Sequence, residues 1–184
     1  MAKQNLRHNI DIGNLANSAS SDIQFLKGDV LDASSRPKFE GRFDVLVSNP
    51  PYISPHAFAK TTARSVRNHE PLTALVPPPA SYQEDLPIDQ GDIFYPRLLQ
   101  IAERFQAQVI LFEVADMDQA KRVSSLVLKH ARWQVCEIWR DWPVQGSEAD
   151  DCKLVIEDKK VPVKGEGEGR AVFAWTCNGH KILM

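Results

Sequence analysis

The feature that most limits how this chain can fold is an apolar run at residues 43–48, followed at once by Asn49-Pro50-Pro51-Tyr52. A short apolar run bounded by turn residues is typical of a buried strand. Because proline has no N–H and a fixed φ, two successive prolines end the strand's hydrogen-bond ladder and stiffen the backbone where it leaves the sheet. Open α/β sheets bind their ligands at the carboxyl ends of strands, so we expect a ligand site here.

Composition places the chain among ordinary globular proteins. Its 184 residues, 43% hydrophobic and 25% charged, suit a single domain with a real core. A net charge of -2 and a pI near 6.2 give no basic field of the kind that drives non-specific nucleic-acid binding. A nucleic-acid substrate is therefore unsupported by charge, although charge alone does not exclude it.

Cysteine usage and the chain's beginning indicate a compartment. The three cysteines form no CxxC pair, and the five histidines show no metal-ligand spacing, so we expect neither a disulfide framework nor a metal site. The first residues lack the apolar core of a signal peptide, and no apolar run approaches the ~20 residues that span a bilayer. We expect a reduced intracellular protein without a membrane segment, in the cytoplasm or a mitochondrion.

The first half of the chain predicts few regular elements. Residues 2–8 are good helix formers, 9–21 are polar and loop-like, and 23–27 alternate like a short strand ended by Gly28-Asp29. After the strand at 43–48, the region up to residue 91 is proline-rich and has no clear periodicity, which predicts a long loop.

The second half alternates helices and strands. Apolar spacing predicts these elements: a helix opening at 92–96, a strand at 108–114, a helix at 118–130 capped by Asp118, and strands at 134–142, 153–156 and 170–176. The glycine-rich run at residues 164–169 predicts the flexible end of a hairpin. Two final strands without a helix between them predict an α/β fold with a mostly parallel sheet and an antiparallel strand near the C-terminus.

Five segments together carry a resemblance to a known family. They are Phe43–Ile53, Arg67–Leu75, the strand ending in Glu113 with the following Gln119, and Arg170-Ala171-Val172. The chain resembles the HemK/PrmC family of S-adenosylmethionine-dependent protein-(glutamine-N5) methyltransferases, which have a class I, Rossmann-like sheet. That family methylates the glutamine side chain in the Gly-Gly-Gln tripeptide of peptide-chain release factors, so the resemblance implies a release factor as partner.

The resemblance also implies roles for the residues of the turn. An amide nitrogen is a poor nucleophile, and acceptors on both of its N–H bonds can orient it for attack. The side-chain oxygen of Asn49 and the carbonyl of Pro50 would be those acceptors, Tyr52 would stack on the amide, and Pro51 would stiffen the turn. Asn49, Pro50 and Tyr52 are thus the expected catalytic residues, and Glu70 and Pro71 are expected to shape the substrate pocket with the turn.

Other site residues have a simpler alternative. Asp29 and Val30 match the place where the family holds the adenine edge of S-adenosylmethionine, with Asn49 also on the cofactor side, but Gly28-Asp29 can equally be a plain turn. Glu70 can instead form a surface ion pair with Arg67. Glu113, at a strand's carboxyl end, is well placed to face the site.

The family's Gly-rich cofactor cradle has no counterpart in this sequence. We therefore expect a truncated copy that lacks the first two strands: residues 1–184 as a partial catalytic domain with irregular insertions at 76–91 and 143–169, exposed strand edges and weak or no cofactor binding. Two alternatives stay open. The same turn can grip the amino group of adenine in DNA or RNA for N6 methylation, or the chain can be a non-catalytic pseudoenzyme or fragment.

Overall fold

The computed structural model describes residues 2–32, 41–79, 89–144 and 152–182. The chain divides into two compact units, Met1–Phe39 and Glu40–Met184, which are described separately. The Asn49–Tyr52 turn, Glu70 and Pro71 lie in the second unit, whereas Asp29 and Val30 lie in the first.

The first unit contains two helices, α1 (Ala2–Asp11) and α2 (Ala19–Asp22). The helix predicted at 2–8 is confirmed, but the polar loop predicted at 9–21 is partly wrong, because α1 continues into it and α2 begins before its end. The strand predicted at 23–27 is also wrong. Residues 23–27 have no strand assignment, and their apolar side chains are 39–54% exposed. Alternation specifies a strand only when a neighbouring strand supplies the hydrogen-bond ladder.

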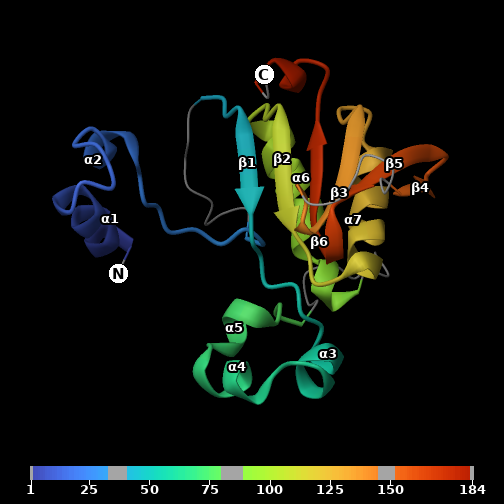
Figure 1. Ribbon diagram of the computed structural model, residues 1–184, viewed down its shortest axis with the longest axis horizontal. Helices are drawn as coiled ribbons and strands as arrows, with labels where there is room; N and C mark the ends of the chain where they lie inside the picture. Colours follow the sequence, from blue (N-terminus) through green and yellow to red (C-terminus); the bar gives the residue numbers. More distant parts are fainter. Residues whose placement is uncertain (1, 33–40, 80–88, 145–151, 183–184) are drawn as a thin grey trace. The chain divides into compact units, whose positions relative to one another are not determined.

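The second unit is built on a six-stranded sheet with the order β1-β2-β6-β3-β5-β4. Its strands are β1 (Val45–Ser48), β2 (Val109–Glu113), β3 (Val135–Trp142), β4 (Cys152–Ile156), β5 (Lys159–Lys164) and β6 (Glu166–Trp175). The neighbours β1 and β2 run parallel, as do β3 and β5, while β6 is antiparallel to β2 and β3 (Figure 1). Four strands thus share one direction, which confirms the mostly parallel α/β sheet.

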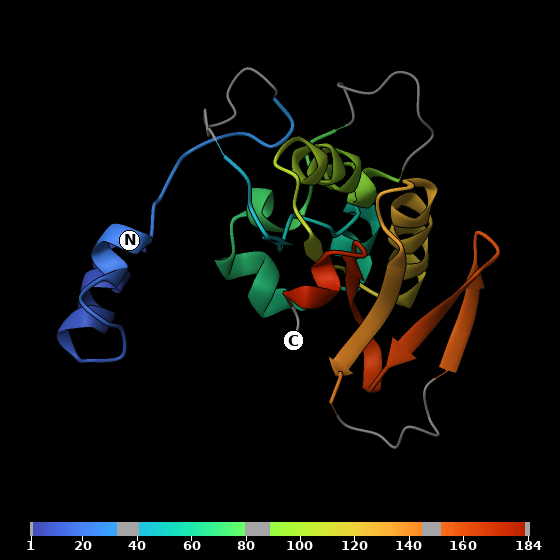
Figure 2. The ribbon, with the colours of Figure 1, turned by 90° about the horizontal axis from the view of Figure 1, so that it is seen from above.

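Two helices cover one face of this sheet, as the view from above shows (Figure 2). They are α6 (Phe94–Arg104), preceded by the 3-10 turn η1 (Gln90–Asp92), and α7 (Met117–Lys129); a second 3-10 turn, η3 (Gly179–Lys181), follows β6. The strand residues beneath the helices, including Ile110, Phe112 and Val172, are fully buried. The cap of α7 is Asp116 and not Asp118, because the Asp116 carboxylate accepts the Gln119 N–H at 2.8 Å.

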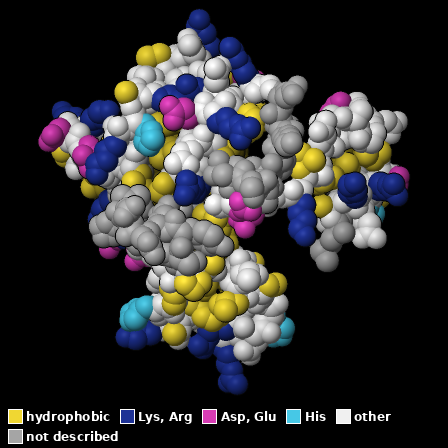
Figure 3. Space-filling model, turned by 180° about the vertical axis from the view of Figure 1, so that it is seen from behind, with side chains coloured by type: hydrophobic (Ala, Val, Ile, Leu, Met, Phe, Trp, Pro, Cys, Tyr) yellow, Lys and Arg dark blue, Asp and Glu magenta, His cyan; other side chains and the backbone are white. Residues whose placement is uncertain are grey.

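The region expected to be one long loop contains three short helices. They are α3 (Pro55–Lys60), α4 (Arg64–His69) and α5 (Leu72–Leu75). Each has six residues or fewer, too few turns to show a helical repeat of apolar side chains in the sequence. From behind, the surface over these helices shows apolar side chains bordered by basic ones (Figure 3). Residues 80–88 of the expected 76–91 insertion lie outside the described residues.

The prediction that residues 143–169 form an irregular insertion is wrong. This segment contains β4, β5 and the start of β6, and residues 145–151 lie outside the description. Gly165 joins β5 to β6, but these two strands flank β3, so the connection passes around the end of β3 and is not a hairpin. Gly165 has φ +81, and a side chain there would overlap the Trp142 carbonyl. The glycine-rich run therefore marks a tight backbone crossing.

Candidate functional site

The Asn49–Tyr52 turn begins where β1 stops. Ser48 is the last residue of β1 to pair with β2, opposite Phe112, and the two prolines that follow Asn49 have no N–H to continue the ladder. Pro50 is buried, Pro51 and Tyr52 are half-buried, and Asn49 is exposed. The chain then enters α3 through Ile53, whose N–H donates to the Leu75 carbonyl at 2.9 Å. The turn is thus held at its far end by the last residue of the short-helix region.

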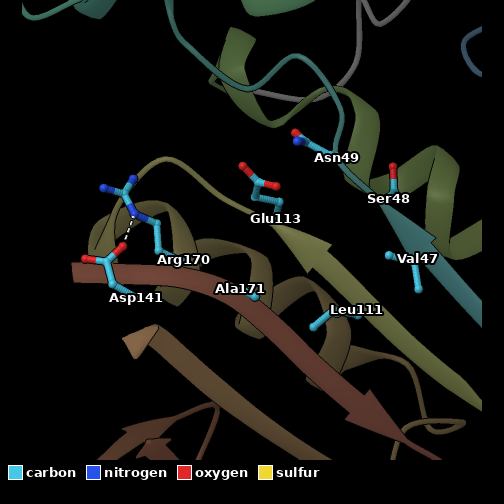
Figure 4. A pocket seen from close by; sticks show the side chains of 8 residues that line it. All are labelled: Val47, Ser48, Asn49, Leu111, Glu113, Asp141, Arg170 and Ala171. Atoms are coloured by element: carbon cyan, nitrogen blue, oxygen red, sulfur yellow. Dashed lines mark hydrogen bonds and ion pairs between the residues drawn. The ribbon is translucent and has the colours of Figure 1, made fainter. Parts of the chain in front are cut away.

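A pocket of about 320 Å³ opens beside this turn on the face of the sheet opposite α6 and α7. Four strands or their ends contribute its lining: Val47, Ser48 and Asn49 from β1, Leu111 and Glu113 from β2, Asp141 from β3, and Arg170 and Ala171 from β6 (Figure 4). The strand interiors form an apolar floor, and the charged and amide groups lie toward the end where β1 and β2 finish. This is the edge of the sheet at which the sequence predicts a ligand.

Tyr52 is anchored to Glu113. Its hydroxyl donates to Glu113 Oε1 at 2.7 Å, so the end of β1 is tied to the end of β2. Burial, the hydrogen bond to Glu113 and the negative charge of that carboxylate raise the pKa of Tyr52 to about 12. On β2 itself, the main-chain carbonyl of Glu113 accepts a hydrogen bond from the buried Tyr95 hydroxyl at 2.8 Å. The phenol of Tyr52 is therefore a neutral donor near physiological pH, with its hydroxyl end held at Glu113.

An ion pair forms the opposite side of the pocket. Arg170 Nε donates to Asp141 Oδ1 at 2.6 Å, and the guanidinium also donates to the Ala115 carbonyl at 2.8 Å. The other oxygen of Asp141 accepts the Glu168 N–H. The pairing lowers the pKa of Asp141, mainly through the Arg170 hydrogen bond, and raises that of Arg170. Both groups stay charged over the range in which proteins are stable.

Asn49 differs from its neighbours because its side-chain amide is available to bind a ligand. Within the described parts of the chain, the Asn49 amide makes no hydrogen bond to another residue. Figure 4 shows it at the end of β1, on the same side of the pocket as the Glu113 carboxylate. An exposed amide with one acceptor oxygen and two donor hydrogens can bind another amide or an amino group directly.

The second predicted substrate segment does not line this pocket. Glu70 and Pro71 connect α4 to α5 and are exposed. Glu70 still lies within electrostatic range, since its charge is among those that raise the pKa of Tyr52. The alternative for Glu70, an ion pair with Arg67, is not formed in the described structure. Arg67 donates instead to the Ala59 carbonyl at 3.2 Å.

Asp29 and Val30 belong to the first unit. The Asp29 carboxylate accepts the Leu31 N–H at 2.9 Å, the geometry of an Asx turn, while Val30 is half-buried. This hydrogen bond is the one expected if Gly28-Asp29 forms a plain turn. Their contact with a cofactor, and that of Asn49, stays a prediction.

Sequence reasoning missed several polar residues around the turn. Asp141 gave no signal beyond its place in an alternating strand, yet it lines the pocket. Asp92, expected only at the start of a helix, is 3% exposed and pairs with Arg122 on α7. Buried carboxylates that bond residues some thirty positions away cannot be recognised from local pattern. Among the described residues, no group of three or more His, Cys, Asp or Glu side chains could hold a metal ion, and no described helix is long and apolar enough to cross a membrane.

The sheet and its neighbouring turn define the class of protein, an α/β fold of the class I methyltransferase type. Comparison with known proteins gives the family. The chain is 30% identical to a release factor glutamine methyltransferase of Bacillus subtilis over 148 residues, which are 78% of this chain and 45% of that protein. It is 48% identical over 63 residues, 34% of this chain and 21% of the relative, to the enzyme of the same name from Chlorobaculum tepidum.

A eukaryotic relative gives the same result. The chain is 32% identical over 130 residues to a probable mitochondrial N(5)-glutamine methyltransferase of Schizosaccharomyces pombe, covering 65% of this chain and 38% of that protein. No family model and no solved structure matches the chain. By sequence similarity the chain resembles the HemK/PrmC family of release factor glutamine methyltransferases, and it spans less than half the length of the relatives named here.

Proposed function

We propose that the second unit contains the methyl-acceptor half of a protein-glutamine N-methyltransferase site, which binds the glutamine of the Gly-Gly-Gln segment of a peptide-chain release factor. One observation carries the proposal: the Asn49 amide is exposed and unbonded among described residues, at a pocket whose neighbouring tyrosine is anchored. The names of the relatives support glutamine as acceptor.

The residues of the turn would divide the work of holding a planar amide. Asn49 Oδ1 and the Pro50 carbonyl would each accept one N–H of the glutamine side chain, which fixes the nitrogen and draws its lone pair toward attack. The Tyr52 ring would cover one face of the amide, and its hydroxyl bond to Glu113 would hold the end of the side chain in place. Pro51 restricts the backbone, so the acceptors need not reorganise when the substrate binds.

The cofactor implied by the family is S-adenosylmethionine, and the charge of the pocket fits its reactive end. When bound, it would supply an electrophilic methyl group that moves to the glutamine nitrogen, with the bonding electron pair left on sulfur and one amide proton released to solvent. The Glu113 carboxylate at the pocket gives a negative potential suited to a positively charged sulfur. Asn49 is the residue of this pocket that we assign to the cofactor side, while the assignment of Asp29 and Val30 stays a prediction from the sequence.

We expect this chain to bind S-adenosylmethionine weakly. Both carboxylates that line the pocket already accept hydrogen bonds, Glu113 from Tyr52 and Asp141 from Arg170 and the Glu168 N–H, so fewer acceptor positions remain for the ribose hydroxyls. Isothermal titration calorimetry of the full chain measures this directly. Micromolar affinity would overturn the expectation.

The function is tested by a competition assay. The full chain, excess labelled S-adenosylmethionine, a bacterial release factor and an adenine-containing oligonucleotide are incubated together, and mass spectrometry locates the methyl group. We expect label on the glutamine of Gly-Gly-Gln and none on adenine. Asn49→Ala should abolish transfer while leaving the circular dichroism spectrum unchanged.

The other results separate the alternatives. Label on adenine would support the nucleic-acid reaction, and release-factor binding without label would identify a non-catalytic binding protein. If the release factor is neither bound nor methylated, the proposal fails.

A further inference from the structure

A buried polar network lies behind the turn, on the side away from the pocket, and its centre is the side chain of Gln119. Gln119 is in the first turn of α7 and is 2% exposed. Burying an amide is unfavourable unless its donors and acceptor are all satisfied. The partners of Gln119 therefore show what the residue holds in place.

The Gln119 amide joins segments from three parts of the unit. Its oxygen accepts the Ala115 N–H at 2.7 Å, directly after β2. Its nitrogen, which carries two hydrogens, shares them among three acceptors: Asp92 Oδ1 at 2.8 Å, the Gly91 carbonyl at 3.1 Å and the Tyr52 carbonyl at 3.2 Å. One side chain thus bridges the turn after β1, the chain after β2 and the entrance to α6.

The bond to Tyr52 matters because the turn has few other anchors. Pro50 and Pro51 have no N–H, so the backbone between Ser48 and Ile53 can be tied to the protein mainly through its carbonyls. Tyr52 is held at both ends: Gln119 binds its carbonyl and Glu113 binds its hydroxyl. Since Glu113 and Ala115 flank the end of β2, these two bonds set the spacing between the turn and β2.

The network is also packed so that Gln119 has little freedom. Asp92 is 3% exposed, and Arg122 donates to both of its oxygens, at 2.6 and 3.1 Å. A Cβ added at Gly91 would lie 2.6 Å from the Tyr52 carbonyl oxygen and 3.2 Å from Gln119 Nε2. The amide orientation of Gln119 is therefore fixed by three acceptors on its nitrogen side and one donor on its oxygen side.

We propose that Gln119 is a positioning residue for the acceptor site, acting through the Tyr52 carbonyl to hold the Asn49–Tyr52 turn at a fixed distance from Glu113. The inference rests on the proposed function, because the expected effect of Gln119 is on glutamine binding. Gln119 itself lies behind the turn and is not among the residues that line the pocket.

The first test uses Gln119→Glu in the full chain. This variant keeps the size and the acceptor for Ala115 but replaces the donor nitrogen by an oxygen facing the Tyr52 carbonyl and Asp92. A synthetic peptide containing Gly-Gly-Gln should bind about tenfold more weakly at pH 8, as expected for a lost buried donor. Because the nearby Asp92 carboxylate raises the pKa of the introduced acid, lowering the pH should protonate it, return one donor and restore part of the affinity.

Gln134→Glu is the matched control. It makes the same change at an exposed glutamine whose side chain also accepts a backbone N–H, that of Cys177 at 2.8 Å. Its peptide affinity should equal the wild type at both pH values. Equal weakening of the two variants, or loss in Gln119→Glu without recovery on acidification, would contradict positioning.

A second readout does not depend on peptide binding. In chain labelled with 3-fluorotyrosine, the ¹⁹F resonance of Tyr52, assigned with Tyr52→Phe, should shift or broaden in Gln119→Glu and stay unchanged in Gln134→Glu. If Gln119→Glu does not fold, Gln119→Met, which keeps the length without a charge, takes its place in this measurement. An unchanged Tyr52 resonance would overturn the inference. A wild-type chain that does not bind the peptide would instead contradict the proposed function.

Discussion

Two arginine–aspartate pairs flank the Asn49–Tyr52 turn, and they share one equally short hydrogen bond in different environments. Arg122–Asp92 and Arg170–Asp141 are both joined by an Nε–Oδ distance of 2.6 Å, and both arginine side chains are nearly half exposed. The aspartates differ, because Asp92 has a side chain that is 4% exposed and Asp141 one that is 33% exposed. Bond length therefore says little about what each pair does.

The difference in exposure between Asp92 and Asp141 gives the two ion pairs different roles, one in stabilising the turn and one in lining the ligand pocket. Asp92 is buried with Gln119, so its charge must be balanced inside the protein, and the pair stabilises the back of the turn. Asp141 lines the pocket, where water can replace any lost partner, and an exposed pair of this kind contributes little to folding. We infer that the buried pair fixes the site and the exposed pair can rearrange when a ligand enters.

The largest expected effect follows from removing the buried carboxylate. Asp92→Ala removes the carboxylate partner of Arg122 and one of the three acceptors of the Gln119 amide, and we expect it to lower the free energy of unfolding by about 2–4 kcal/mol. Urea unfolding followed by tryptophan fluorescence reports on the second unit, which contains all four tryptophans. Asp141→Ala is the matched control and should unfold like the wild type. Equal losses in the two variants would remove the distinction between the pairs.

A methyl group at Gly91 tests how tightly the buried side is packed. Gly91→Ala would push against the Tyr52 carbonyl oxygen and the Gln119 amide, so a backbone or side-chain shift must follow. We expect a loss of about 1–3 kcal/mol, typical of overpacking, in the same urea experiment. Stability equal to that of the wild type would show that the backbone or side chains on this side of the turn can shift without cost.

The smallest effect is confined to alkaline pH. The pKa of Tyr52 is raised from 10.0 to about 12 in the folded protein, so the folded state favours the protonated phenol. Its contribution is fully present below pH 10, where the unfolded tyrosine is also protonated, and is lost as the pH rises from 10 to 12. Tyr52→Phe removes this titration while leaving that of the buried Tyr95. The free energy of unfolding should fall more in the wild type than in Tyr52→Phe between pH 9 and pH 11.5. An equal fall in the two proteins would show that the Tyr52–Glu113 hydrogen bond is not formed in the folded state.

Part of the fold could be read from local pattern. The strands at 43–48 and 108–114 and the helix beginning near residue 92 were predicted from apolar spacing, and the structure confirms them. The short helices α3 to α5 were missed because each is too short to show a repeating apolar face. The strand predicted at 23–27 was wrong because alternation cannot provide a partner strand.

The sequence by itself determined the turn. Two prolines after an apolar strand dictate a rigid exit from the sheet, because a fixed φ and a missing N–H are local, covalent properties. The Asn49-Pro50-Pro51-Tyr52 order contributes to the resemblance to the family only together with the other four segments. Only the tertiary structure decided what surrounds that turn. Glu113, Gln119 and Asp92 come from positions 40 to 70 residues away, and whether each faces the pocket or the buried side depends on how the strands and α7 pack. Long-range hydrogen bonds form only after the chain has folded, so local residue order cannot specify them.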